Sequence, residues 1–141
     1  MAEMLDLYGG ASKVVRAVTD RALRPFGLQL GQDHLLAALW RRDGQTPGEL
    51  AAELRVTTPA ITKGATVLER MGLLVRRPDA RDNRLVRLWL TEQGRALEEP
   101  VRQARRQVEA RLIRMLSAQE REIFLASLAK ILEAGRDDEA G

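Results

Sequence analysis

The apolar positions of the chain first follow the period of an α-helix. Pro25 and Gly27 separate two such stretches, because both residue types interrupt helices. The first stretch has apolar residues at steps of three and four, which places them on one helical face: Leu5, Tyr8, Ala11, Val15, Val18 and Ala22. The second stretch ends at Asp43-Gly44 and has this buried side: Leu35, Leu36, Leu39 and Trp40.

Two helix start signals follow closely. Thr46-Pro47-Gly48-Glu49 is a capping box with proline at the first helical position, and Thr57-Thr58-Pro59 is a second start. The helix that opens there turns Ile61, Ala65 and Leu68 inward and stops at Gly72. Helices of about eight and about thirteen residues, joined by a short turn, predict a helix-turn-helix.

The hydrophobic period then changes to two. The segment RLVRLWL (84–90) alternates between two faces, with Val86, Leu88 and Leu90 on one of them. This pattern predicts a two-stranded hairpin, or wing, with its tip near residues 80–83. Thr91 is expected to cap the next helix.

The C-terminal third returns to the helical period. One stripe comprises Leu97, Val101, Ala104, Val108, Leu112 and Met115. Pro100 lies within it and should kink the helix or delay its start. Ser117 and Glu120 form a capping box that opens a last helix with an apolar face: Ile123, Phe124, Leu128, Ile131 and Leu132.

This order predicts a mainly α (α+β) fold. We expect a winged helix-turn-helix lobe over residues 28–95, helical regions at 1–27 and 96–135, and a disordered acidic tail at 136–141. The helical regions are too apolar on one face to stand alone, so they should form a layer that a second copy of the chain completes. An intramolecular bundle is the alternative. The expected dimer contacts are Leu5, Val15, Val108, Leu112, Phe124, Leu128 and Ile131.

Candidate chemistry for an enzyme is weak. The chain has no cysteine and one histidine, His34, which argues against a zinc or copper site and excludes disulfides. No glycine-rich phosphate loop, nucleophile elbow or HExxH motif is present. We therefore expect no catalytic residue, no metal and no cofactor. The acidic start lacks the apolar core of a signal peptide and no apolar run approaches ~20 residues, so we expect a cytoplasmic protein without a membrane segment.

The basic residues point to a polyanion. Lysine and arginine number 23 against 20 acids, and only three of the 23 are lysines. Arginine suits phosphate, although the base composition of the genome could also raise its share. Within residues 76–87, five arginines accompany two aspartates. A solvated turn is the plain interpretation, whereas a narrow arginine-rich hairpin can also enter the minor groove of DNA.

The helix from Thr58 has a matching surface. Thr62, Lys63 and Arg70 lie opposite its buried face, and its first turn has small or hydroxyl side chains. A helix that enters the major groove needs slim residues at its leading end, and its free amides favour a phosphate. An ordinary amphipathic helix shows the same pattern, so this helix alone does not establish DNA binding.

Four segments together resemble the MarR family of bacterial winged-helix regulators. RPDARDNR fits the family's D-x-R-D-x-R wing signature. The other three are LQLGQDHLLAAL (28–39), TPGELAAELRVTTPAITKGATVLERMGLLVRR (46–77) and LTEQGRAL (90–97). The resemblance implies a homodimeric transcriptional repressor. Its partner would be double-stranded DNA, bound at a pseudo-palindromic promoter site.

The resemblance also implies site residues. The recognition helix would be 58–71, with DNA-facing residues Thr57, Thr58, Pro59, Ala60, Thr62 and Lys63. In the wing, Arg81 or Arg84 would enter the minor groove beside Asn83, and Arg76 and Arg77 would contact flanking phosphates. Asp79 and Asp82 would orient the arginines, and either could pair with Arg84.

Members of the family often respond to phenolic or carboxylated aromatic ligands. The resemblance places such an effector in a cleft between the dimer layer and the lobe, with these candidates: Tyr8, Ser12, Arg16, His34 and Trp40. Without cysteine, thiol-based oxidant sensing is excluded. The alternative function is a winged-helix module whose basic wing docks an acidic protein.

Overall fold

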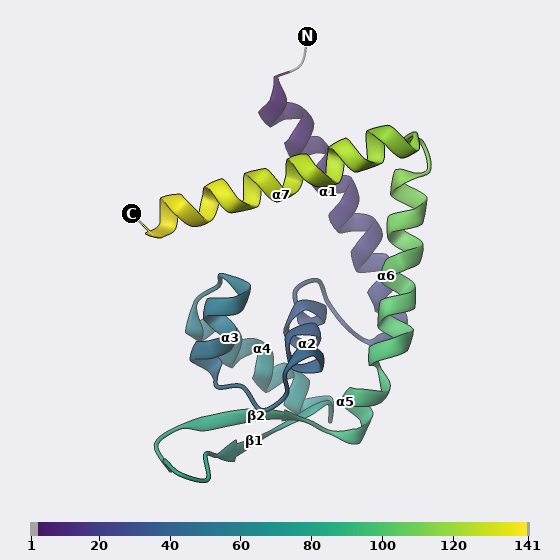
Figure 1. Ribbon diagram of the computed structural model, residues 1–141. Helices are drawn as coiled ribbons and strands as arrows, with labels where there is room; N and C mark the ends of the chain where they lie inside the picture. Colours follow the sequence, from purple (N-terminus) through teal and green to yellow (C-terminus); the bar gives the residue numbers. More distant parts are fainter. Residues whose placement is uncertain (1–2, 141) are drawn as a thin grey trace. The chain divides into compact units, whose positions relative to one another are not determined.

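The computed structural model describes residues 3–140, with side chains to Arg136. The predicted order of elements, mainly helical with a two-stranded wing, is confirmed (Figure 1). The elements are α1 (Met4–Leu23), the 3-10 turn η1 (Arg24–Phe26), α2 (Gln32–Arg41), α3 (Pro47–Leu54), α4 (Thr58–Arg70), β1 (Leu74–Pro78), β2 (Val86–Leu90), α5 (Glu92–Ala96), α6 (Glu98–Ile113) and α7 (Ala118–Ala140).

The chain forms two compact units that divide between Arg106 and Gln107. This division differs from the expected lobe of 28–95, because both flanking helices reach the core of the first unit. Leu23 at the end of α1 and Val101 in α6 are fully buried in that core. The lobe is therefore fixed to the ends of α1 and α6, and α6 continues into the second unit.

The core of the first unit is built mainly of leucine from the helices and the two strands. Its fully buried leucines are Leu23, Leu36, Leu39, Leu50, Leu68, Leu74 and Leu88. Burying a side chain of this size contributes roughly 1.5–3 kcal/mol. These contacts hold α3, α4 and the wing together as one lobe.

Side chains cap four helices as the sequence predicts. The hydroxyls of Thr46, Thr57 and Thr91 accept from the amides of Glu49 (3.1 Å), Ala60 (3.2 Å) and Gly94 (3.1 Å). Ser117 and Glu120 cap α7 reciprocally, at 3.1 and 3.0 Å. Each such cap is worth about 1 kcal/mol.

The wing strands are antiparallel, with Leu74 opposite Leu90 and Arg76 opposite Leu88. Leu88 and Leu90 are buried whereas Trp89 is exposed, as the alternation predicts, but Val86 near the hairpin tip is exposed although it was expected on the same face as Leu88. The amide of Leu88 also donates to the carbonyl of Gln45 at 2.9 Å, so the wing is attached to the segment before α3.

The glycine of the LTEQG segment, Gly94, lies where the structure leaves no room for a side chain. A Cβ at this position would collide with the carbonyl oxygen of Leu73. The short helix α5 therefore packs directly on the main chain that enters β1.

Pro100 delays a helix start. α5 ends at Ala96 and α6 begins at Glu98, which puts Pro100 in the first turn, where its missing amide needs no helical partner. At the C-terminus the expected disorder of 136–141 differs from the structure, because α7 is helical to Ala140. Alanine and glutamate favour helices, so acidic charge alone does not end one. Gly141 lies outside the described residues.

Several residues expected at the dimer contact are exposed in the single chain. The exposed fractions are 71% for Leu5, 61% for Ile131 and 46% for Phe124, and Val15 is also exposed. Val108 is buried, and Leu112 and Leu128 are half-buried. Within residues 3–140, no helix is both long and apolar enough to cross a membrane.

Candidate nucleic-acid interface

The start of α4 presents an exposed polar surface. Ile61, Ala65 and Leu68 face the core. Every residue predicted to face DNA is exposed on the other side: Thr57, Thr58, Pro59, Ala60, Thr62 and Lys63. The structure therefore brings these six together around the capped helix start. Its free main-chain amides and Lys63 give this end positive potential.

The turn before α4 is tight. Arg55, which ends α3, has a φ of 57°, the left-handed conformation that usually favours glycine. The amide of Val56 donates to the carbonyl of Ala51 at 3.1 Å. Nothing in the sequence indicates this conformation, because arginine is not a residue type that favours it.

The carboxylate of Asp79 shapes the wing turn. Its Oδ2 accepts from the main-chain amides of Arg81 and Asp82, both at 2.9 Å. Its own amide donates to the carbonyl of Leu85 at 2.8 Å. The hydrogen bond from the Arg87 side chain, followed by the two amides, lowers the pKa of Asp79 to about 2.

Arg87 is a further residue of the wing site, and no sequence motif distinguishes it from the other wing arginines. Its Nε donates to Asp79 Oδ1 at 2.6 Å, and its Nη1 donates to the carbonyl of Gly44 at 2.8 Å. Glu49 Oε1 of α3 lies 3.6 Å from Nη1. The side-chain bond to Asp79 is the main cause that raises the pKa of Arg87. Asp79 therefore orients Arg87 and the turn, rather than the side chain of Arg84.

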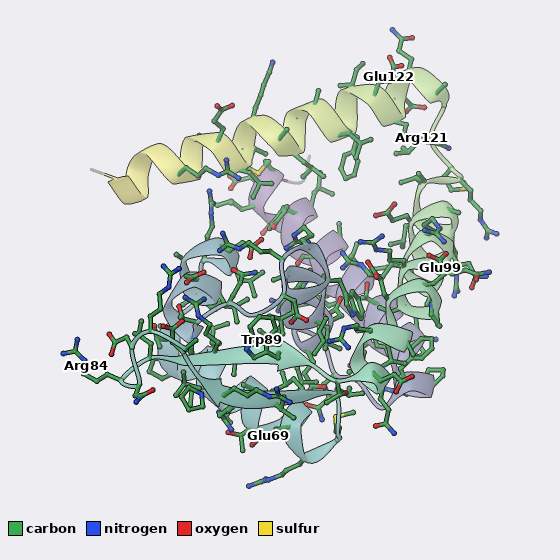
Figure 2. All side chains as sticks on the ribbon, turned by 60° about the horizontal axis from the view of Figure 1, so that its bottom comes forward. Glu69, Arg84, Trp89, Glu99, Arg121 and Glu122 are labelled. Atoms are coloured by element: carbon green, nitrogen blue, oxygen red, sulfur yellow. The ribbon has the colours of Figure 1, made fainter. Side chains whose placement is uncertain are left out.

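Asp82 pairs with Arg84, one of the two pairings expected. Arg84 donates to Asp82 Oδ1 through its amide (3.1 Å) and its Nε (3.0 Å). These bonds lower the pKa of Asp82, with the side-chain bond as the larger cause. The Arg84 side chain is nevertheless 91% exposed, and Figure 2 shows it pointing outward from the hairpin. Arg81 and Asn83 are exposed on the same turn.

The two arginines at the start of the wing differ. Arg77 is exposed, as a phosphate contact requires. Arg76 instead turns to α4, where it bonds Glu69, Thr66 and the main chain of Thr62. The Arg76 guanidinium, which was expected at a flanking phosphate, thus has three partners on α4 in this structure.

The five effector candidates lie in different surroundings. Trp40 donates from Nε1 to the carbonyl of Gly94 at 2.9 Å and packs on the core, so it holds α5. Tyr8 and Arg16 are exposed and Ser12 is half-buried on α1. Only His34 of the five lines a groove of about 610 Å³ along α2, α3 and α4. Other lining residues include Leu30, Val56, Lys63 and Gly64.

The chain is similar in sequence to known DNA-binding regulators. The sequence model described as the MarR family matches residues 28–86. An HTH-type transcriptional regulator of Mycobacterium bovis is 33% identical over 79% of this chain and 77% of its own. An HTH-type transcriptional repressor of the same organism is 30% identical over 84% of this chain and 85% of its own.

A solved protein–DNA complex shares the fold. The crystal structure of the S. aureus MepR–DNA complex aligns with a TM-score of 0.86 at 29% identity, over 95% of this chain and 99% of that chain.

Proposed function

Because this chain belongs to the MarR family of DNA-binding transcriptional regulators, which is non-enzymatic, we propose that it represses transcription by binding a pseudo-palindromic promoter site as a homodimer. The observation that carries the proposal is the joint exposure of the α4 start and the Arg84 guanidinium on one lobe. The repressor named among its relatives and the MepR–DNA complex support the same function.

Each lobe would contact DNA at two places. The start of α4, with Thr58, Thr62 and Lys63, would enter the major groove, where hydroxyls and a charged amine reach bases and phosphates. The wing would enter the adjacent minor groove with Arg84 or Arg81, because negative potential concentrates there. The carboxylates of Asp79 and Asp82 are neutralised by arginine, so they repel phosphate less.

The homodimer is supported by exposed apolar residues at both ends of the chain. On α1 these are Met4, Leu5, Leu7, Tyr8, Val14 and Val15, and on α7 they are Ile123, Phe124, Leu125, Ile131 and Leu132. Apolar surface on this scale marks an interaction site in a protein that folds in water. A second copy would bury it and create the two-fold symmetry of a palindromic site. Sedimentation at micromolar concentration should give about twice the mass of one chain.

A small aromatic or phenolic acid is the proposed effector. The groove beside α4 supports it, because apolar Leu30 and Val56 lie there with the cationic Lys63. A ligand in this groove would change the affinity for DNA if it binds more tightly to one of two conformations that differ in the placement of α4. Benzoate and phenol, titrated into the DNA complex, test this: release of DNA supports the proposal, and unchanged affinity across aromatic acids contradicts it.

Selection from a random pool of duplexes tests the DNA function. We expect enrichment of a pseudo-palindrome with half-site centres about one helical turn, ~10 base pairs, apart. If the protein binds every duplex equally weakly, a winged-helix module that docks an acidic protein becomes the better interpretation.

A further inference from the structure

The guanidinium of Arg76 joins the wing to the recognition helix. From β1, its Nη1 donates to Glu69 Oε1 at 2.8 Å. Its Nη2 donates to the Thr66 hydroxyl at 2.8 Å and to the carbonyl of Thr62 at 3.1 Å. One side chain of the wing thus contacts three residues of α4, Thr62, Thr66 and Glu69, which lie on successive turns of one helix face.

The contact reaches the part of α4 that faces DNA. The Thr66 hydroxyl also donates to the carbonyl of Thr62, at 3.0 Å. Thr62 and Lys63 are exposed at the proposed DNA surface, so Arg76 contacts the main chain immediately beneath it. The fork of arginine can bond several acceptors in one plane, which a lysine ammonium cannot do with fixed geometry.

Burial and charge separate Arg76 from the other wing arginines. Its side chain is 29% exposed, compared with 91% for Arg84. Glu69, 40% exposed, neutralises it at 2.8 Å. Moving the Arg76 guanidinium to a phosphate would break three bonds to α4, whereas the exposed guanidinium of Arg84 bonds Asp82 alone.

We propose that Arg76 and Glu69 form a positioning pair that sets the orientation of α4 relative to the wing, and thereby the specificity of DNA binding. The proposal rests on the two-point DNA contact described above. Correct readout requires the helix in one groove and the wing in the next to fit simultaneously. Loss of the pair leaves each element able to contact DNA but removes their fixed separation.

For the Glu69→Gln variant, a positioning pair and a simple charge effect predict opposite changes in the affinity for DNA. Removing an acid near DNA strengthens binding if only charge matters. The positioning pair predicts weaker binding to a duplex selected with the wild-type protein, by about tenfold, and little change on a scrambled duplex of equal length. Equal or tighter binding of Glu69→Gln to the selected duplex would overturn the proposal.

Lysine substitutions provide a matched comparison. Arg76→Lys and Arg77→Lys keep the charge at adjacent positions, so a phosphate contact survives both. We expect Arg76→Lys to lose about tenfold on the selected duplex and Arg77→Lys to lose less than about twofold. The double variant Glu69→Gln/Arg76→Lys should bind about as weakly as Arg76→Lys alone, because the two residues act as one pair. Equal losses for the two lysine variants, or additive losses in the double variant, count against the pair.

A measurement without DNA separates this proposal from the proposed operator. Amide hydrogen exchange of the free protein should quicken several-fold in α4, but not in α2, when Glu69→Gln or Arg76→Lys is introduced. Unchanged exchange in α4 overturns the positioning pair whatever DNA the protein selects. Conversely, failure to select any sequence contradicts the operator and leaves the exchange result valid.

Discussion

Arg105 Nη1 of α6 lies 3.6 Å from Oδ2 of Asp33 in the first turn of α2. Asp33 is only 1% exposed, and this oxygen has no hydrogen-bond partner among the residues that the structure describes. The other oxygen, Oδ1, accepts from the amide of Gly31 at 3.1 Å. The ion pair therefore connects α6 to the lobe at a site where a carboxylate would otherwise lack a counter-ion.

Replacing Arg105 should destabilise the fold. Removing one partner of a buried pair leaves an uncompensated charge, which costs about 3–5 kcal/mol when both groups are buried. Because Arg105 is 37% exposed, we expect roughly 1–3 kcal/mol for Arg105→Met in urea denaturation. The variant Asp33→Asn/Arg105→Met should recover part of this loss. A midpoint for Arg105→Met equal to that of the wild type would show that the pair contributes nothing.

Gly94→Ala should also destabilise the protein, for a steric reason. The added Cβ would meet the carbonyl oxygen of Leu73, a main-chain atom that cannot move without displacing β1. We expect a loss of more than about 2 kcal/mol in thermal or urea unfolding. Gly48→Ala is the control, because the nearest atom is 4.0 Å away and alanine favours α3 by about 0.5–1 kcal/mol. Similar effects of the two substitutions would argue against close packing of α5 on the chain entering β1.

Acid should weaken the wing through Asp79. The pKa of its carboxyl falls from 3.8 to about 2 in the folded protein, chiefly because of the Arg87 bond. A depressed folded pKa gives stabilisation that is full above the unfolded value and is lost as the pH falls through the folded one. Stability should therefore decrease between about pH 4 and pH 2, and Asp79→Asn should decrease less steeply. Parallel pH profiles for the two proteins would contradict this role of Asp79.

The features that could be predicted from the sequence depend on residues that are close together in the chain. Thr46, Thr57 and Thr91 cap helices through amides three residues away, so the signal and its partner lie in one short segment. The alternation of apolar residues in β2 likewise predicted the burial of Leu88 and Leu90.

The sequence did not predict contacts between distant segments. Arg87 bonds the carbonyl of Gly44, which is 43 residues away, and Arg76 bonds α4 rather than remaining exposed like Arg77. Nothing in the wing motif distinguishes these arginines, because their partners come together only when α2, α3 and α4 have packed.

We propose that the recognition helix and the wing tip contact DNA together. The most direct measurement compares Arg84→Ala with Arg121→Ala in salt titrations of binding to the selected duplex. Both arginines are exposed, but Arg121 belongs to α7, which contains no residue of the proposed interface, so Arg121→Ala removes the same charge as a control. We predict that Arg84→Ala costs roughly 1–3 kcal/mol and flattens the salt slope by about one, while Arg121→Ala changes neither. Equal effects of the two substitutions, or wild-type affinity and slope for Arg84→Ala, would contradict the account.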